Sequence, residues 1–376
     1  MFLKLLRKKY LFLHKFPAFL FLALSCMFHL DKLLLGPYGF VTITDAFDSE
    51  FPQFKAVAGW IRTVGLIQWL PNIAGGMPAY ANQYALYHPF VLLAFIFPLW
   101  FIYFFLVITW MFLAGYGMYL LLKDFFECRI DISILGGTLF ALSSQIQLNI
   151  TPTVAFLYTF PLFAWMVFSK NQNFFKRCAL LVIMLFSYPV ITFPFFSVLH
   201  LILIFFKDGK GQRIKKLLQW TVLWLGYLFL FYPVIQSLRC YLPVMSRYYS
   251  PNSESIFSLM KQYGFAYLTY SMTISFFCGS LFLICYSKSL RNLVYATVFF
   301  VFLSSFFRSI ESNFLFGTIF MKMDLFHFYW TLNIMAIFVS SYAINLVIAR
   351  PALFSRFVGG GANRPCRNPF LQTTCP

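Results

Sequence analysis

Hydrophobic residues form long runs over most of this chain, and short groups of basic residues separate these runs as far as about residue 350. A helix needs about 20 apolar residues to cross a bilayer, and glycine, proline and charged groups mark where such runs end. The sequence therefore predicts an all-α polytopic membrane protein with about ten transmembrane helices. The expected spans are 16–35, 99–122, 132–148, 151–169, 174–188, 190–206, 216–238, 266–287, 291–307 and 328–349.

Two of these runs, 174–188 and 190–206, are short and meet at Tyr188-Pro189. They form either a tilted hairpin or a re-entrant element. The period of the apolar positions does not separate these cases because both faces of each run are apolar. The number of spans is therefore open by about two.

Composition places the chain in the same class. Hydrophobic residues make up 61% of it, charged residues only 11%, and the mean hydropathy is +0.76. No soluble fold has enough interior for that much apolar surface, whereas a bilayer solvates it directly. The net charge of +18 comes from basic runs between apolar segments, which is typical of membrane topology signals and disfavours a nucleic-acid partner. The eight cysteines have no metal-ligand or CxxC spacing, so we expect neither a zinc site nor a disulfide framework.

The distribution of positive charge predicts the orientation in the membrane. Cytoplasmic loops of membrane proteins carry an excess of lysine and arginine. Most of the 29 basic residues fall in the N-terminal segment, at Arg350, or in the loops 123–129, 170–177, 207–216 and 288–291. That side is predicted to be cytoplasmic, and the N-terminus with it. The segments on the opposite, outer side are 36–98, 239–264 and 308–327.

The first outer segment, 36–98, is long and far more polar than its surroundings, as functional or internally structured loops are. Alternating apolar and polar residues over 47–64 predict a helix that lies on the membrane surface. Asp45, Asp48 and Glu50 stand where this helix begins. Carboxylates are costly near hydrocarbon and are usually kept there for a function.

These carboxylates have two readings. Asp48 caps the surface helix, with Asp45 and Glu50 merely solvated, or Asp45 accepts a proton from a hydroxyl nucleophile at the membrane interface. The three-residue spacing of Asp45 and Asp48 places both on one face of a helical turn, so a shared proton or a divalent cation remains open. The cation is the weaker interpretation, and the sequence assigns no cofactor.

Other outer residues also have a structural and a functional reading. Arg239, Arg247 and Lys261 are either interface anchors or ligands of a phosphate. Trp69 and Tyr84 fit an aromatic belt but also fit stacking on a sugar ring. His88 and His327 are single histidines, for which structural hydrogen bonds are favoured over metal binding. The chain has no P-loop, GxSxG or HExxH motif, which disfavours an ATP-driven pump or a soluble-type hydrolase.

The first outer segment resembles the YfhO-like membrane proteins of the GT-C glycosyltransferase superfamily. The resemblance covers about 1–350 and is most specific over 44–98. A late segment, Phe326-His327-Phe328-Tyr329, is also similar, although an arginine is commoner there in the family. The residues that carry the resemblance are Asp45 with Pro52, Trp69-Leu70-Pro71-Asn72, Gly75-Gly76-Met77-Pro78 and Tyr87-His88-Pro89-Phe90.

This resemblance implies a transmembrane domain over 1–350 whose first outer loop forms a partial lid. It implies a multi-pass protein of the bacterial cytoplasmic membrane that transfers a sugar from a polyprenyl-phosphate donor to an extracytoplasmic acceptor, a cell-wall polymer or a glycolipid. Asp45 would be the general base, with Asp48 as the alternative. Substrate-binding roles would fall on Glu50, Trp69, Asn72, Tyr84, His88, Arg239, Arg247, Lys261 and His327.

Two other functions remain open. A transporter or flippase of a lipid-linked saccharide would be expected to carry ionisable or helix-breaking groups near mid-span in matched halves, and these are sparse here. A catalytically inactive family member is the other. The tail 351–376 contains Gly359-Gly360-Gly361 and loses the aromatic character of the rest, so we expect a disordered or aberrant end. Members of the resembling family usually run longer, which favours a shortened chain.

Overall fold

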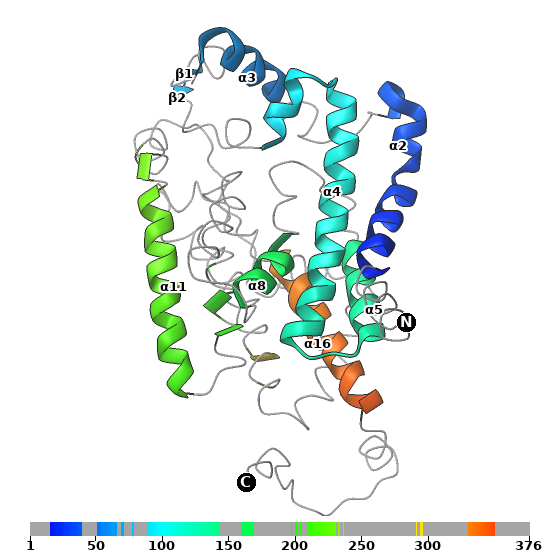
Figure 1. Cartoon of the computed structure of the whole chain (residues 1–376), viewed down its shortest axis with the longest axis vertical. Helices are drawn as coiled ribbons and strands as arrows, with labels where there is room; N and C mark the ends of the chain where they lie inside the picture. Colours follow the sequence, from blue (N-terminus) through cyan, green and yellow to red (C-terminus); the bar gives the residue numbers. More distant parts are fainter. Residues whose placement is uncertain are drawn as a thin grey trace, which may run out of the picture.

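The computed structural model describes eight stretches of the chain and a few isolated helical residues within 197–204, 232–236 and 291–295. In this part of the chain the structure is helical apart from one two-stranded antiparallel sheet, so the prediction of a mainly helical protein is confirmed there (Figure 1). The stretches are 16–39, 51–65, 69–70, 77–78, 89–142, 159–168, 210–230 and 330–349.

Helix α4 (Leu99–Leu120) is the centre of the described structure. None of its 22 residues is charged, and it continues without a break into a turn of π-helix, η5 (Leu121–Phe125). The segment Leu99–Phe125 is, among the described residues, the one straight helix long and apolar enough to cross a membrane. The helical prediction for 99–122 is thereby confirmed. The prediction of ten spans also involves segments outside the described residues, so it stays a prediction.

The first expected span, 16–35, is bent rather than straight. The helix Phe16–Phe28 and the helical segment Leu30–Tyr38 meet at an angle of 51° and count as a second candidate span only if they are taken together. The second limb comprises α2 (Leu30–Leu35) and a 3-10 turn, η1 (Gly36–Gly39), and Gly36 has a φ of +53° that side chains disfavour. His29 lies at the bend.

Close contacts between helix backbones hold the centre together. α4 packs against α5 (Ile130–Ala141) and α8 (Phe160–Phe168), and α5 packs against α16 (Trp330–Ala349). A Cβ atom at Gly117 would lie 2.5 Å from the backbone nitrogen of Leu162, and one at Gly137 would lie 2.6 Å from the carbonyl oxygen of Gly115. Such small residues at helix contacts are typical of membrane bundles, where close packing replaces the hydrophobic effect.

Helix α11 (Lys210–Leu230) corrects one predicted boundary. The sequence placed 207–216 in a loop and a span at 216–238, but the basic residues of 210–216 form the first two turns of the helix. Lysine, arginine and glutamine are good helix formers, so charge alone does not end a helix. Of the other expected spans, 132–148 overlaps α5, which begins two residues earlier, and 151–169 and 328–349 contain α8 and α16. The rest lie outside the described residues apart from isolated positions.

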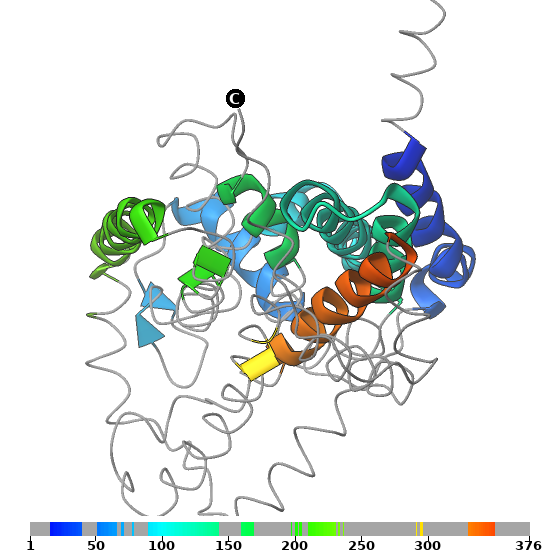
Figure 2. The ribbon, with the colours of Figure 1, turned by 90° about the horizontal axis from the view of Figure 1, so that it is seen from below.

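The ends of the described helices fall into two groups at opposite ends of the molecule. The C-terminal ends of α4 and α16 and the N-terminal end of α11 lie at one end, and α3 (Phe51–Val64) lies at the other (Figure 1). The view from below places α11 and the first helical segments at opposite edges, with α4, α5 and α16 between them (Figure 2). Lys123, Arg129 and the basic turns of α11 therefore belong to the end remote from α3.

Candidate functional site

Helix α3 is the longest described element of the segment 36–98, which the sequence predicted to lie on the outer side. The sequence predicted a helix over 47–64, and the structure confirms a helix at Phe51–Val64. It packs on η4 (Pro89–Phe95), the 3-10 helix that leads into α4. Val57 and Ala58 are buried, and the Nζ atom of Lys55 donates to the carbonyl oxygen of Ala94 at 3.4 Å. One face of α3 is thus fixed at the end of the bundle.

A short hairpin follows α3 in the chain. Strand β1 (Trp69–Leu70) pairs antiparallel with β2 (Met77–Pro78), with Trp69 opposite Pro78 and Leu70 opposite Met77. The pairing brings together the two ends of the motif that carried the family resemblance. Among the predicted site residues, Trp69 is the one whose backbone is placed, and it lies in this hairpin.

The remaining predicted site residues lie outside the described part of the chain. The structure therefore neither gathers them into a site nor separates them. The acidic segment 45–50 nevertheless ends immediately before Phe51, the first residue of α3, so it is joined directly to this helix. The residues concerned are Asp45, Asp48, Glu50, Asn72, Tyr84, His88, Arg239, Arg247, Lys261 and His327.

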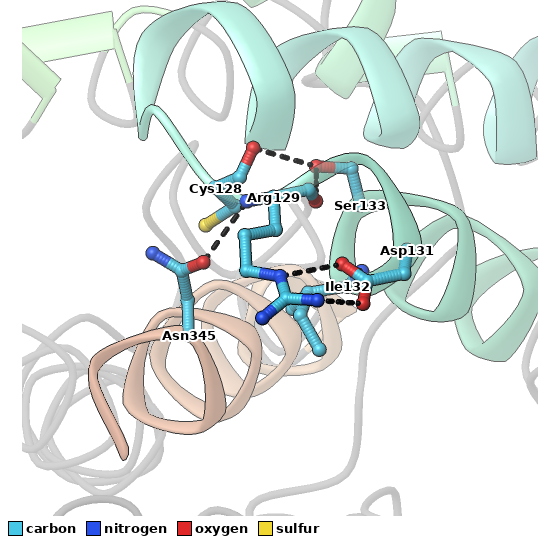
Figure 3. Close-up of polar contacts among 6 residues, drawn as sticks. All are labelled: Cys128, Arg129, Asp131, Ile132, Ser133 and Asn345. Carbon is cyan, nitrogen blue, oxygen red and sulfur yellow. Dashed lines mark hydrogen bonds and ion pairs between the residues drawn. The ribbon is translucent and has the colours of Figure 1, made fainter. Parts of the chain in front are cut away.

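A polar junction at the other end of the bundle was not singled out by the sequence. The guanidinium of Arg129 donates to both carboxylate oxygens of Asp131, from Nε at 3.2 Å and from Nη2 at 2.8 Å (Figure 3). The backbone N–H of Arg129 donates to Oδ1 of Asn345 at 2.9 Å, and the hydroxyl of Ser133 donates to the carbonyl of Arg129 at 2.9 Å. The bond to Asn345 joins the start of α5 to α16, and the others are local to the start of α5.

A second polar contact joins α4 to α8 near the same end. The indole Nε1 of Trp165 donates to Oδ2 of Asp124 at 2.7 Å, and Lys123 lies 3.9 Å from the other oxygen of that carboxylate. The ammonium of Lys123 also stands 5.7 Å from the centre of the Tyr119 ring, within range of a cation–π contact. The available signal was two acids, Asp124 and Asp131, in and beside the basic loop 123–129. Asp124 contacts a second helix through Trp165, whereas Asp131 pairs with Arg129 at the start of its own helix.

Between η5 and α5 the chain makes a tight connection. Glu127 has a φ of +57°, which a side chain of this length disfavours, and Cys128 is buried beside it. Burial raises the pKa of the Cys128 thiol to about 12, so the thiol stays protonated at neutral pH. Cys128 is therefore a packing residue and not a nucleophile.

The Arg129–Asp131 pair gives a prediction for pH dependence. Hydrogen bonds from Arg129 hold the pKa of the Asp131 carboxyl below its usual value of about 3.9. The lowered pKa stabilises the folded state at pH values above the pKa that this carboxyl has in the unfolded chain. This contribution is lost as the pH falls through the pKa of the folded protein. We expect Asp131→Asn to lower the unfolding temperature slightly at pH 7, and the gap from wild type to close below about pH 4. Thermal unfolding in detergent across this range measures it, and a gap that persists in acid contradicts the ion-pair origin.

No triplet of His, Cys, Asp or Glu side chains within the described stretches is arranged to hold a metal ion. Comparisons with protein-family models, with curated proteins and with solved structures found no match. The polar contacts around Arg129 and around Asp124 offer no free nucleophile and no open metal position. We interpret them as structural contacts between and within helices. The candidate functional site is the region of α3 and the acidic segment that leads into it.

Proposed function

We propose that this chain is an integral-membrane glycosyltransferase that moves a sugar from a polyprenyl-phosphate donor to an extracytoplasmic acceptor. The observation that carries the proposal is the position of α3. The acidic segment 45–50 runs directly into this helix, which lies at the end of the bundle opposite the basic helix ends. By the positive-inside rule the basic end is expected to face the cytoplasm, so we propose that the acids stand on the outer side, near the lipid head groups.

The exposed surface of α11 supports placement in a bilayer. Five large apolar side chains recur along one face of this helix at spacings of three and four residues, and all of them are exposed. A soluble monomer rarely leaves so continuous an apolar stripe in water, whereas lipid solvates it without cost. The stripe comprises Ile214, Leu218, Val222, Leu225 and Phe229.

The proposed reaction is a single displacement at the anomeric carbon. A hydroxyl oxygen of the acceptor attacks that carbon, the bond from the carbon to the phosphate oxygen breaks, and the configuration inverts. The lipid phosphate leaves with the bonding electron pair, and the carboxylate of Asp45 takes the hydroxyl proton. A phosphate needs little protonation to leave, so cationic side chains suffice to stabilise it, and Arg239, Arg247 and Lys261 are proposed for this role.

The first span favours a transporter of a lipid-linked saccharide as the second candidate. The span is broken at His29, a residue 2% exposed whose two ring nitrogens have no hydrogen-bond partner among the described residues. Transporters use broken helices and intramembrane ionisable groups at their substrate sites. This feature stands alone among the described helices, so we place sugar transfer first.

One assay separates the two functions. Membranes that contain the wild-type protein are supplied with radiolabelled polyprenyl-phosphate sugars, and label is followed both into an extractable glycan or glycolipid and across the bilayer. We expect label in the acceptor. Label that crosses the bilayer while still attached to the polyprenyl phosphate, without transfer, contradicts the enzyme and supports the transporter.

A further inference from the structure

The outer face of α3 carries two cations with an open space between them. Lys55, Gly59, Arg62 and Thr63 are exposed and occur at positions i, i+4, i+7 and i+8, which share one helical face. A Cβ atom at Gly59 would meet no atom within 4 Å. We call Lys55, Gly59 and Arg62 the α3 notch.

Neither cation of the notch is neutralised by the described residues. The ion pairs among them involve Asp31, Asp124 and Asp131, all away from α3. The ammonium of Lys55 gives one hydrogen bond to the carbonyl of Ala94, which fixes its position and leaves further N–H donors. The guanidinium of Arg62 has no ion pair with any residue that the structure describes.

We propose that the α3 notch binds the phosphate group of a membrane lipid. The helix rise of 1.5 Å per residue separates the Cα atoms of Lys55 and Arg62 by about 10 Å, which two long side chains can close around one phosphate. Arg62 supplies a planar pair of donors and Lys55 a point charge, the two cation types that phosphate sites use. Gly59 keeps the space between them free, so the ligand approaches the helix backbone.

The position of the helix selects a phosphate on a lipid over a free one. The inner face of α3, at Val57 and Ala58, is buried on the structure that leads into α4. The notch lies on the exposed flank beside this face, where Lys55 reaches across to the carbonyl oxygen of Ala94. A helix that lies across the end of a membrane bundle places its polar face at head-group level. The inference rests on the membrane placement under the proposed function, but it does not require sugar transfer.

Direct binding tests the notch. The full-length protein is placed in phosphatidylcholine nanodiscs and titrated with fluorescent phosphatidylglycerol, with polyprenyl phosphate, and with inorganic phosphate as competitor. We expect Lys55→Gln and Arg62→Gln each to weaken lipid binding about tenfold, since each removes a charge-assisted contact. Gly59→Leu should weaken it similarly by filling the space, although leucine favours an exposed helix more than glycine does. Lys215→Gln, an exposed cation on α11, is the matched control and should leave binding unchanged.

The outcomes divide cleanly. Preference for polyprenyl phosphate assigns the notch to the donor lipid, and equal binding of phosphatidylglycerol assigns it to the bilayer; both support a lipid-phosphate site. Equal binding by wild type and all three notch variants overturns the proposal, as does displacement of the lipid by equimolar inorganic phosphate. Unchanged lipid binding in Arg62→Gln also overturns it, because the proposed site needs both cations. Because binding is read directly, a protein without transferase activity still gives a decisive result.

Discussion

Replacing Asp45 with asparagine is expected to slow sugar transfer by about 10²–10⁴-fold, the usual contribution of a positioned general base. The amide has the shape of the carboxylate but accepts no proton at neutral pH. The acceptor hydroxyl would then have to lose its proton to water during the attack. Initial rates of transfer from a radiolabelled polyprenyl-phosphate sugar, measured in membranes with matched amounts of protein, give the comparison.

The neighbouring acids supply controls for this substitution. Asp48→Asn and Glu50→Gln remove the same charge from the same segment. A loss confined to Asp45→Asn identifies the base, and a larger loss in Asp48→Asn moves the role to that residue. A cysteine at Ser49 should react with a membrane-impermeant reagent in intact cells. Labelling only after the cytoplasmic side is opened would remove the acids from the outer surface and end the enzymatic proposal.

Substituting leucine for Gly117 is expected to destabilise the folded bundle by about 3 kcal/mol, near the upper end of the usual cost of overpacking. A Cβ atom here would lie 2.5 Å from the backbone nitrogen and 2.7 Å from the Cα atom of Leu162. Both are main-chain atoms of α8, so no rotamer change relieves the clash, and α8 itself must move away from α4. Unfolding in mixed detergent micelles would show the loss as a lower denaturation midpoint.

Gly226 is the matched control for this helix-packing effect. It also lies inside a helix, α11, but a Cβ atom there would meet nothing within 4 Å. Gly226→Leu should be neutral or stabilise by up to about 1 kcal/mol through helix propensity. If both substitutions destabilise the protein equally, the close contact between α4 and α8 is not the cause of the loss of stability in Gly117→Leu.

Long apolar runs and amphipathic spacing were enough to predict several helices. The uninterrupted apolar run at 99–122 and the alternation over 47–64 correspond to α4 and α3. The start of α11 was misplaced because charged residues were treated as loop formers, although their backbone preference is helical. The bend at His29 was also missed, since neither proline nor glycine marks it and composition alone favours one straight span.

The polar junctions between helices were not predictable from the sequence, whereas the acids of the candidate site were, for a physical reason. Asp124, Trp165 and Asn345 come from three helices far apart in the sequence, and only tertiary packing brings such side chains to their partners. Sequence spacing reports neighbours within one helix and carries no information about contacts of that range. The proposed catalytic acids are a local cluster and were therefore visible, but their role stays a prediction.

The bond from the Arg129 amide to Asn345 spans 216 residues, and this separation constrains how the protein is assembled. In the proposed membrane protein, α4 and α5 would emerge and enter the bilayer long before α16 leaves the ribosome. Until then the backbone amide of Arg129, the residue before α5, has no acceptor from α16, and Gly136 lacks the Ser341 side chain that packs against it. The early helices therefore keep these contacts unmade until α16 is synthesised. We expect a nascent chain stopped before residue 345 to be a preferred substrate for membrane proteases.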